Sequence, residues 1–281
     1  MKSALIIGAS RGIGRQISLT LAANGYQVGV ASKTETSTAA LPGSIHSVVE
    51  EIKSRGGSAI PIRCDARNEE DIRGAVYACT KQFGKIDLAV YNAGAILWKK
   101  VIETPLKRYD LMNSVNMRGS YVMVQEVLPK MLERKCGKII LVSPPIYNRF
   151  FKGKTPYAVT KVGMTVLVHG LANELTDTGV SVSALWPTSA IKSFVTEKMN
   201  TPDEVMYTSE IFADAVLKIA EEPSQKLNGM ALLDEDYLRS EGVSDFTKYR
   251  CNPACAPPRM MPKKIPSLLV DEELETTFPK L

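Results

Sequence analysis

The sequence is poor in the residues that mark metal centres, disulfide frameworks and membrane spans. Among 281 residues it has two histidines and five cysteines. No apolar run reaches the roughly 18 residues that a membrane-spanning helix needs. The cysteines are odd in number and mostly scattered, which favours reduced thiols in an intracellular compartment. The chain enters an apolar run directly after Met1-Lys2, so we expect neither a signal peptide nor a membrane anchor.

The composition excludes other classes of protein. Cys251 and Cys255 are close enough in sequence to pair or to share a metal ion, but His46 and His169 lie far from both, so we expect no metal. The net charge of +5 is mild and spread along the chain, which argues against nucleic-acid or membrane partners. With 44% hydrophobic and 23% charged residues, the chain is typical of a globular protein with one large core.

Short apolar runs alternate with longer amphipathic stretches. The runs predict seven strands, at 4–7, 28–31, 59–62, 86–91, 138–143, 180–186 and 230–233. The stretches between them predict helices at 12–24, 44–55, 68–83, 105–133, 156–177 and 209–221. This alternation requires crossover connections in a parallel sheet. We therefore expect an α/β fold with one Rossmann-type, doubly wound sheet.

The pattern dissolves near the C-terminus. Residues 252–258 read Asn-Pro-Ala-Cys-Ala-Pro-Pro, and a proline-rich segment of this kind continues neither a helix nor a central strand. We therefore divide the chain into a dinucleotide-binding catalytic domain, residues 1–240, and an extended tail, residues 241–281. The tail either packs over the core or reaches a neighbouring subunit.

A glycine-rich turn follows the first expected strand. Residues 8–14 read Gly-Ala-Ser-Arg-Gly-Ile-Gly and precede the first helix, where a Rossmann fold binds a dinucleotide. The glycines let the backbone approach the pyrophosphate, and the helix N-terminus favours its negative charge. We expect cofactor contacts from Gly8, Ser10, Arg11, Gly12, Ile13 and Gly14.

The end of the second strand predicts NADP(H) rather than NAD. A ribose-binding acid is expected about 20 residues past the glycines, but none appears before Glu35. Ser32, Lys33 and Arg11 can instead hold a 2′-phosphate. These cations are otherwise ordinary solvated surface charges.

Two further strand ends suit the cofactor. Asp65, after the third strand, can accept from the adenine amino group. Asn92, Ala93 and Gly94 end the fourth strand on the same edge of the sheet. Asp, Asn and Gly are also common turn residues, so a structural role is the alternative.

A tyrosine and a lysine stand one helical turn apart. Thr155-Pro156 predicts a helix start, with Thr155 as N-cap, and places Tyr157 and Lys161 on one face. Lowering the pKa of a tyrosine from 10 to about 7 takes roughly 4 kcal/mol. An ammonium at about 4–5 Å supplies roughly that much at an effective dielectric near 20. The pair is thus a candidate general acid/base, and Lys161 can also bind the nicotinamide ribose.

Two polar residues complete a candidate catalytic group. Ser143, at the end of the fifth strand, can hydrogen-bond a substrate carbonyl oxygen. Asn116 lies within the helix expected at 105–133 and can relay a proton to the lysine through a water. Asparagine is unfavourable inside a helix unless its side chain is bonded, so a structural role is the alternative.

Together these motifs resemble the short-chain dehydrogenase/reductase family over about residues 3–235. The resemblance implies a catalytic tetrad of Asn116, Ser143, Tyr157 and Lys161. It implies hydride transfer from C4 of a nicotinamide. It also implies a homodimer or homotetramer built on the long helices at 105–133 and 156–177.

A narrower resemblance links residues 33–34, 41–46, 107–112, 143–145 and 241–249 to the branch that contains hydroxysteroid dehydrogenase-like protein 2 and citronellol-type dehydrogenases. Three features depart from the wider family. Pro144 stands where the catalytic serine is usual, with Ser143 one residue earlier. The usual Asn-Asn-Ala-Gly begins with Tyr91. Trp186 to Ile191 replace the usual Pro-Gly, and we expect cofactor contacts from Pro187 and Ser193.

We therefore expect an NADP(H)-dependent oxidoreductase that interconverts an apolar ketone or aldehyde with its alcohol. Aromatic residues around the expected nicotinamide site favour an apolar pocket, and residues 192–207 a lid. The alternatives are reduction of an activated carbon–carbon double bond and a nucleotide-bound pseudoenzyme. We expect a cytoplasmic protein; the C-terminal Pro279-Lys280-Leu281 suggests the peroxisome as an alternative.

Overall fold

The computed structural model describes residues 1–269. Its centre is a seven-stranded, entirely parallel sheet in the order β3-β2-β1-β4-β5-β6-β9. The strand bounds are β1 (Ser3–Ile7), β2 (Gln27–Ser32), β3 (Ser58–Arg63), β4 (Leu88–Tyr91), β5 (Gly137–Val142), β6 (Val180–Trp186) and β9 (Ala231–Leu233). This confirms the doubly wound α/β fold, with the strand order reversing between β1 and β4.

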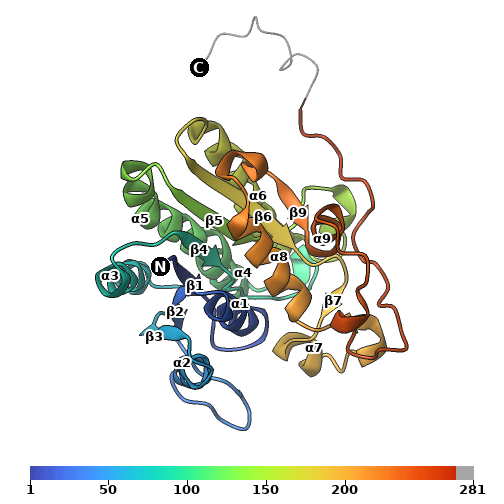
Figure 1. Cartoon of the computed structure of the whole chain (residues 1–281). Helices are drawn as coiled ribbons and strands as arrows, with labels where there is room; N and C mark the ends of the chain where they lie inside the picture. The colour runs from blue at the N-terminus through green and yellow to red at the C-terminus, as the bar shows by residue number, and fades with distance from the viewer. Residues whose placement is uncertain (270–281) are drawn as a thin grey trace, which may run out of the picture.

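Helices cover both faces of the sheet (Figure 1). One face carries α1 (Gly12–Ala23), α2 (Ile45–Ser54) and α8 (Glu210–Glu221). The other carries α3 (Glu69–Phe83), α5 (Gly119–Glu133) and α6 (Thr155–Glu174). Successive side chains of a strand point to opposite faces, so Ala4 and Ile6 join one core while Leu5 and Ile7 join the other. Both cores are buried, as expected for a parallel sheet.

The long helix expected at 105–133 is interrupted. It consists of α4 (Leu106–Met112), a π-helical turn η2 (Asn113–Arg118) and α5. Periodicity alone predicted one continuous helix, but π-turns insert a local widening and often occur at functional sites. Here the widened turn carries Asn116.

The first turn of α6 differs by one residue from the prediction. Lys154 is the N-cap, and Thr155 is the first helical residue with Pro156 behind it. Pro156 still lies in the first turn, where a missing N–H costs no hydrogen bond.

The segment expected to be a lid has structure of its own. It contains α7 (Phe194–Lys198), η4 (Asp203–Val205) and β8 (Met206–Tyr207). The strand β8 pairs with β7 (Ala190–Ile191), which lies just before the segment, in a small two-stranded sheet. Single turns lie elsewhere in the loops, at η1 (Val101–Glu103), η3 (Asn148–Phe151) and η5 (Ser224–Leu227).

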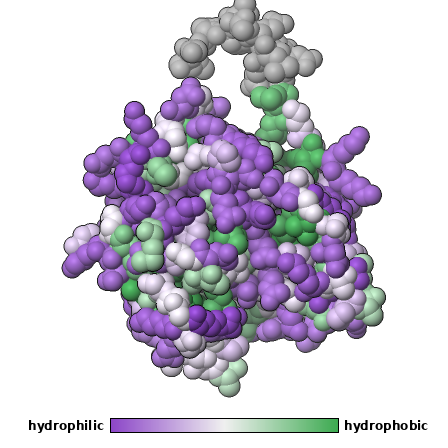
Figure 2. Space-filling model, viewed as in Figure 1, coloured by the Kyte–Doolittle hydropathy of each residue, from purple (hydrophilic) through white to green (hydrophobic). Residues whose placement is uncertain are grey.

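Beyond β9 the chain forms α9 (Asp234–Ser240) and then a long irregular segment with one 3₁₀ turn, η6 (Thr247–Tyr249). This segment follows one edge of the molecule beside α9 and the β7–α7 region (Figure 1). On the face seen in Figure 2, hydrophilic residues dominate and hydrophobic ones gather only in small groups. Pro279-Lys280-Leu281 lie outside the described residues.

Candidate functional site

The glycine turn between β1 and α1 is shaped by close backbone contacts. Gly8 and Gly12 have φ values of +92° and +54°, which favour glycine. A Cβ on Gly14 would collide with Gly8 O and lie 2.6 Å from Asn92 Nδ2. The N-terminus of α1 has no side-chain cap. Its first amide groups therefore remain available to an anion.

The end of the fourth strand supports this turn. Asn92 Nδ2 donates to Gly8 O at 2.8 Å, and Ala93 N donates to Ile7 O at 2.8 Å. A Cβ on Gly94 would lie 3.6 Å from both Asn116 Oδ1 and Lys161 Nζ. The predicted cofactor and catalytic residues therefore meet at Gly94.

The residues predicted to hold a 2′-phosphate lie together but have other contacts. Ser10 Oγ and Ser32 Oγ are 3.1 Å apart, and Lys33 is exposed. The Arg11 guanidinium donates to Pro42 O at 2.9 Å and to Gly43 O at 3.0 Å. Arg11 thus holds the loop that precedes α2, beside the predicted phosphate position.

Asp65 lies at the expected strand end, but its carboxylate is already bound. Both carboxylate oxygens accept from Arg67 Nε, at 2.9 and 3.0 Å. The hydrogen bond from the Arg67 side chain holds the pKa of Asp65 below its ordinary value. An ionised carboxylate has further lone pairs, so it remains an acceptor for an adenine amino group.

Asn116 is completely buried and bonded on both sides of its amide. Its Oδ1 accepts from Ala95 N at 2.8 Å, and its Nδ2 donates to Ala95 O at 3.0 Å and to Thr160 Oγ1 at 2.9 Å. These bonds join the loop after β4 to α6, next to Tyr157 and Lys161. Asn116 therefore has the structural role that the sequence analysis gave as the alternative to a proton relay.

Tyr157 and Lys161 are both buried in α6, one turn apart. Phe150 packs against Tyr157, with ring centroids 6.4 Å apart, and meets Trp186 edge-on at 5.7 Å. Lys161 Nζ lies 5.7 Å from the Trp186 ring centroid and donates to Val142 O at 2.8 Å. Two aromatic rings thus line the tyrosine and the lysine.

The pKa shifts correct one expectation. Burial raises the pKa of the Tyr157 phenol, opposite to the predicted direction, and lowers the pKa of Lys161 to about 7. The missing solvation outweighs the attraction that the sequence suggested. Tyr157 is therefore a neutral phenol near pH 7, which is the protonation state of a proton donor.

The Ser143 hydroxyl has a partner within the fold. Ser143 is completely buried, and Thr165 Oγ1 lies 2.9 Å from Ser143 Oγ and 2.7 Å from Pro144 O. A carbonyl only accepts and Thr165 has one hydroxyl proton, so both contacts are satisfied when Thr165 donates to Pro144 and Ser143 donates to Thr165. The Ser143 proton is then used within the fold and is not free for a substrate carbonyl.

The loop after β6 lies against the glycine turn. Ser193 is the N-cap of α7, accepting from Thr196 N, and its Cβ would lie 3.7 Å from a Cβ on Gly12. Pro187 is followed by Thr188 and Ser189, and Ser189 Oγ is buried without a hydrogen-bond partner in the structure. A buried polar atom without a partner is costly, so a ligand contact would stabilise it.

Sequence reasoning missed three residues that organise the site: Thr160, Thr165 and Asp234. Thr165 lies on α6, one turn beyond Lys161, and this spacing was the available signal. Asp234 is buried and accepts from Thr188 N at 2.8 Å and from Glu235 N at 2.7 Å. Burial raises the pKa of Asp234 to about 6.

All five cysteines are free thiols. Within residues 1–269, no cluster of three or more His, Cys, Asp or Glu side chains has the arrangement of a metal site. Within the same range, no helix is both long and apolar enough to cross a membrane.

Comparison with known proteins identifies the family. Residues 2–204 match the short chain dehydrogenase family model, and the chain belongs to that family. The family comprises oxidoreductases that bind a nicotinamide dinucleotide.

The relatives confirm the narrower resemblance. The chain is 37% identical to hydroxysteroid dehydrogenase-like protein 2 of Danio rerio over 88% of its own length and 60% of the relative's. It thus spans less than two thirds of that relative.

Solved structures are similar over most of the chain. A short chain dehydrogenase from Mycobacterium thermoresistibile is 36% identical with a TM-score of 0.85, covering 92% of this chain and 93% of that one. A 7α-hydroxysteroid dehydrogenase complexed with NADH and 7-oxo glycochenodeoxycholic acid is 25% identical with a TM-score of 0.73, covering 83% and 92%.

The residues present fit a nicotinamide dinucleotide. The tight glycine turn, the uncapped N-terminus of α1 and the unpartnered Ser189 hydroxyl lie along one edge of the sheet. The turn at residues 8–14 would hold the pyrophosphate, and the loop after β6 would hold the nicotinamide.

Proposed function

We propose that the protein is an NADP(H)-dependent oxidoreductase that interconverts an apolar ketone or aldehyde with its alcohol. The main support for the proposal is that Asn116 Oδ1 and Lys161 Nζ both lie close to Gly94. The buried Tyr157 lies one helical turn before Lys161. A reduced nicotinamide would supply the hydride. Tyr157, a neutral phenol, would donate the proton to the substrate oxygen, and Lys161 would bind the nicotinamide ribose.

The polar neighbours have positioning roles in this proposal. Asn116 fixes the loop after β4 and the first turns of α6, so that Tyr157 and Lys161 keep their relative placement. Ser143 and Thr165 hold the chain at Pro144. The substrate oxygen then depends mainly on Tyr157.

The preference for NADP(H) rests on Lys33 and on the lack of an acid at the end of β2. Lys33 is exposed beside Ser10 and Ser32, and its charge complements a 2′-phosphate. The related 7α-hydroxysteroid dehydrogenase is complexed with NADH.

An apolar substrate is supported by the side chains around Tyr157. Phe150, Met112 and Ala158 form a buried cluster with it, and Tyr147, Phe151 and Trp186 pack against that cluster. Aromatic and aliphatic walls favour an apolar ligand. The related dehydrogenase is complexed with 7-oxo glycochenodeoxycholic acid, which carries an oxo group on a largely hydrocarbon ring system.

We further propose a homodimer or homotetramer built on α5 and α6. Tyr121, Leu132, Val159 and Val166 on these helices are exposed hydrophobic residues, and an interface would bury them. Light scattering would give the subunit number. We expect a cytoplasmic protein, with the peroxisome as the alternative, and microscopy of a fusion with a free C-terminus would distinguish the two.

Isotope transfer tests the proposed reaction. The protein would be incubated with NADPH that carries deuterium at C4 and with apolar ketones, aldehydes and unsaturated ketones. Deuterium on the carbinol carbon supports the proposal. Deuterium on the β-carbon would establish alkene reduction instead, and tight NADPH binding without oxidation would establish a pseudoenzyme.

A further inference from the structure

Backbone hydrogen bonds join the segment after α9 to the chain at and just after β8. We call residues 246–262 the strap. Thr208 N donates to Tyr249 O at 2.7 Å, and Cys251 N donates to Met206 O at 3.1 Å. Tyr249 is buried, and its hydroxyl donates to Asp214 Oδ2 at 2.7 Å. The first half of the strap is thus fixed to β8 and α8.

The second half of the strap holds the loop after β6. Met260 N and Met261 N donate to Thr188 O, at 2.9 and 3.1 Å. On its other side Thr188 N donates to the buried Asp234 carboxylate at 2.8 Å. Both backbone polar groups of Thr188 are therefore fixed, one residue after Pro187.

Arg259 connects these strap residues to α9. Its guanidinium makes a bidentate pair with Asp236, with both contacts at 2.6 Å. It also donates to Met261 O at 2.7 Å and to Pro262 O at 2.8 Å. Bidentate arginine–carboxylate pairs combine charge with fixed geometry, so Arg259 sets the position of the strap where it meets Thr188.

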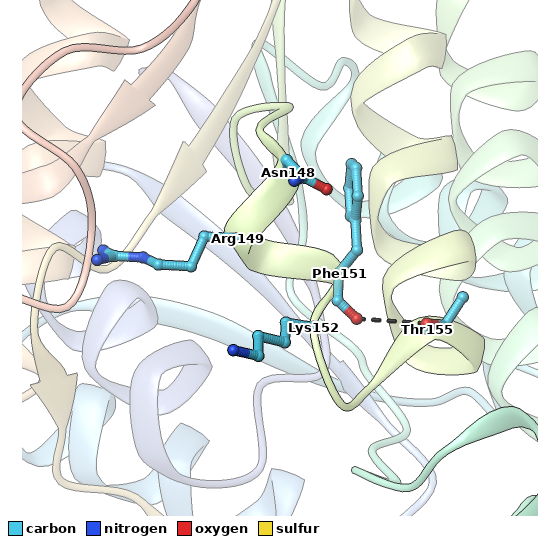
Figure 3. A pocket seen from close by; sticks show the side chains of 5 residues that line it. All are labelled: Asn148, Arg149, Phe151, Lys152 and Thr155. Carbon is cyan, nitrogen blue, oxygen red and sulfur yellow. Dashed lines mark hydrogen bonds between the residues drawn. The ribbon is translucent and has the colours of Figure 1, made fainter.

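The same strap residues hold the loop that carries Phe150. Arg149 Nη2 donates to Met260 O at 2.7 Å, and the Tyr147 hydroxyl lies 3.2 Å from Met261 Sδ. Figure 3 shows the Arg149 side chain extending away from Phe151 and Thr155, which line the same pocket. The strap therefore contacts both the loop that carries Phe150 and the loop that follows Trp186. The rings of Phe150 and Trp186 line Tyr157 and Lys161.

We propose that the strap positions the nicotinamide end of the cofactor site and that Arg259 is its main positioning residue. The inference rests on the proposed function, because it assigns the nicotinamide to the loop of residues 187–193. Loss of Arg259 frees Thr188 O and lets that loop move. The residues expected to hold the adenosine end, Ser32, Lys33 and Asp65, make none of the strap contacts described above.

Two ligands allow binding at the two ends of the cofactor site to be measured separately. NADPH spans both ends, whereas 2′,5′-ADP lacks the nicotinamide. For Arg259→Ala we expect NADPH to bind about tenfold more weakly and 2′,5′-ADP to bind within about twofold of wild type. Arg259→Lys keeps the charge without the bidentate geometry and is expected to lie between the two.

Arg55→Ala is the matched control. Arg55 makes a 2.6 Å ion pair with Glu51 on α2, and the structure gives it no contact with the strap. It is expected to bind both ligands as wild type does. Equal weakening of NADPH and 2′,5′-ADP by Arg259→Ala, or no change in either, would overturn the positioning role.

A second readout needs no ligand. The chain has two tryptophans, so Trp98→Phe leaves Trp186, at the end of β6, as the sole tryptophan emitter. In that background we expect Arg259→Ala to shift the emission to longer wavelength, because Trp186 gains solvent. Unchanged emission would contradict the strap role. A wild-type protein that binds no dinucleotide would instead contradict the proposed function, and the emission would still decide the role of the strap.

Discussion

The two halves of the sheet edge are built in different ways. At β1, β2 and β4 the site is made of backbone and glycine, as where Gly14 packs on Gly8 and Asn92. At β5 and β6 it is made of side-chain contacts between distant segments, such as Arg149 with Met260 and Arg259 with Asp236. In the first half close backbone approaches fix the geometry, and in the second half side chains from separate segments fix it.

In the half of the site at β1, β2 and β4, we expect one added methyl group to weaken cofactor binding strongly. In Gly14→Ala the new methyl group collides with Gly8 O and crowds Asn92 Nδ2, so we expect NADPH affinity to fall at least about 100-fold. Calorimetric titration measures it. Gly74→Ala in α3 is the control, because a Cβ there meets nothing within 4 Å. Retained affinity in Gly14→Ala would show that the turn can relax.

In the half of the site at β5 and β6, we expect a substitution to lower the free energy of unfolding more than it lowers turnover. Thr165→Val leaves Pro144 O and the Ser143 hydroxyl without their shared partner, at a cost of about 2–4 kcal/mol in the free energy of unfolding. Urea denaturation measures this cost.

Ser143→Ala tests whether the Ser143 hydroxyl acts on the substrate or only within the fold. It is expected to lower kcat less than about tenfold, because the arrangement that satisfies both Thr165 contacts has Ser143 donate its proton to Thr165. A donor to a developing oxyanion would cost about 100-fold or more, and a loss of that size would restore Ser143 to the catalytic group.

Lys161 should make stability depend on pH. Its pKa is about 7 in the folded protein, against an ordinary value of 10.5, so the unfolded chain binds one more proton between these values. The free energy of unfolding therefore rises with pH across this window, by up to about 1.4 kcal/mol per unit, and falls as pH drops toward 7. Relative to wild type, Lys161→Met should lack this slope. Parallel profiles would contradict the pKa shift.

Cofactor preference is expected to show the smallest change. Lys33→Ala removes one exposed charge, so we expect the preference for NADPH over NADH to fall about tenfold, or about 1.4 kcal/mol. The ratio of kcat/KM for the two cofactors measures this. An unchanged ratio would assign the 2′-phosphate to Arg11 or Ser32 alone.

The difference between the halves also explains what the sequence predicts. The sheet, the glycine turn and the placement of Tyr157 and Lys161 on one helix follow from periodicity and local spacing. The direction of the Ser143 hydroxyl depends on Thr165, 22 residues away, and the strap depends on contacts spanning more than 100 residues. The π-turn at Asn116 was missed because an apolar period of 3.6 predicts an uninterrupted helix.

Turnover by Tyr157→Phe tests the central claim most directly. The variant keeps the ring that packs on Phe150 and loses only the hydroxyl. With NADPH affinity unchanged, we expect its kcat for reduction of an apolar ketone to fall by about 100- to 10,000-fold, the usual contribution of a general acid. Near wild-type turnover with normal NADPH binding would show that another group delivers the proton.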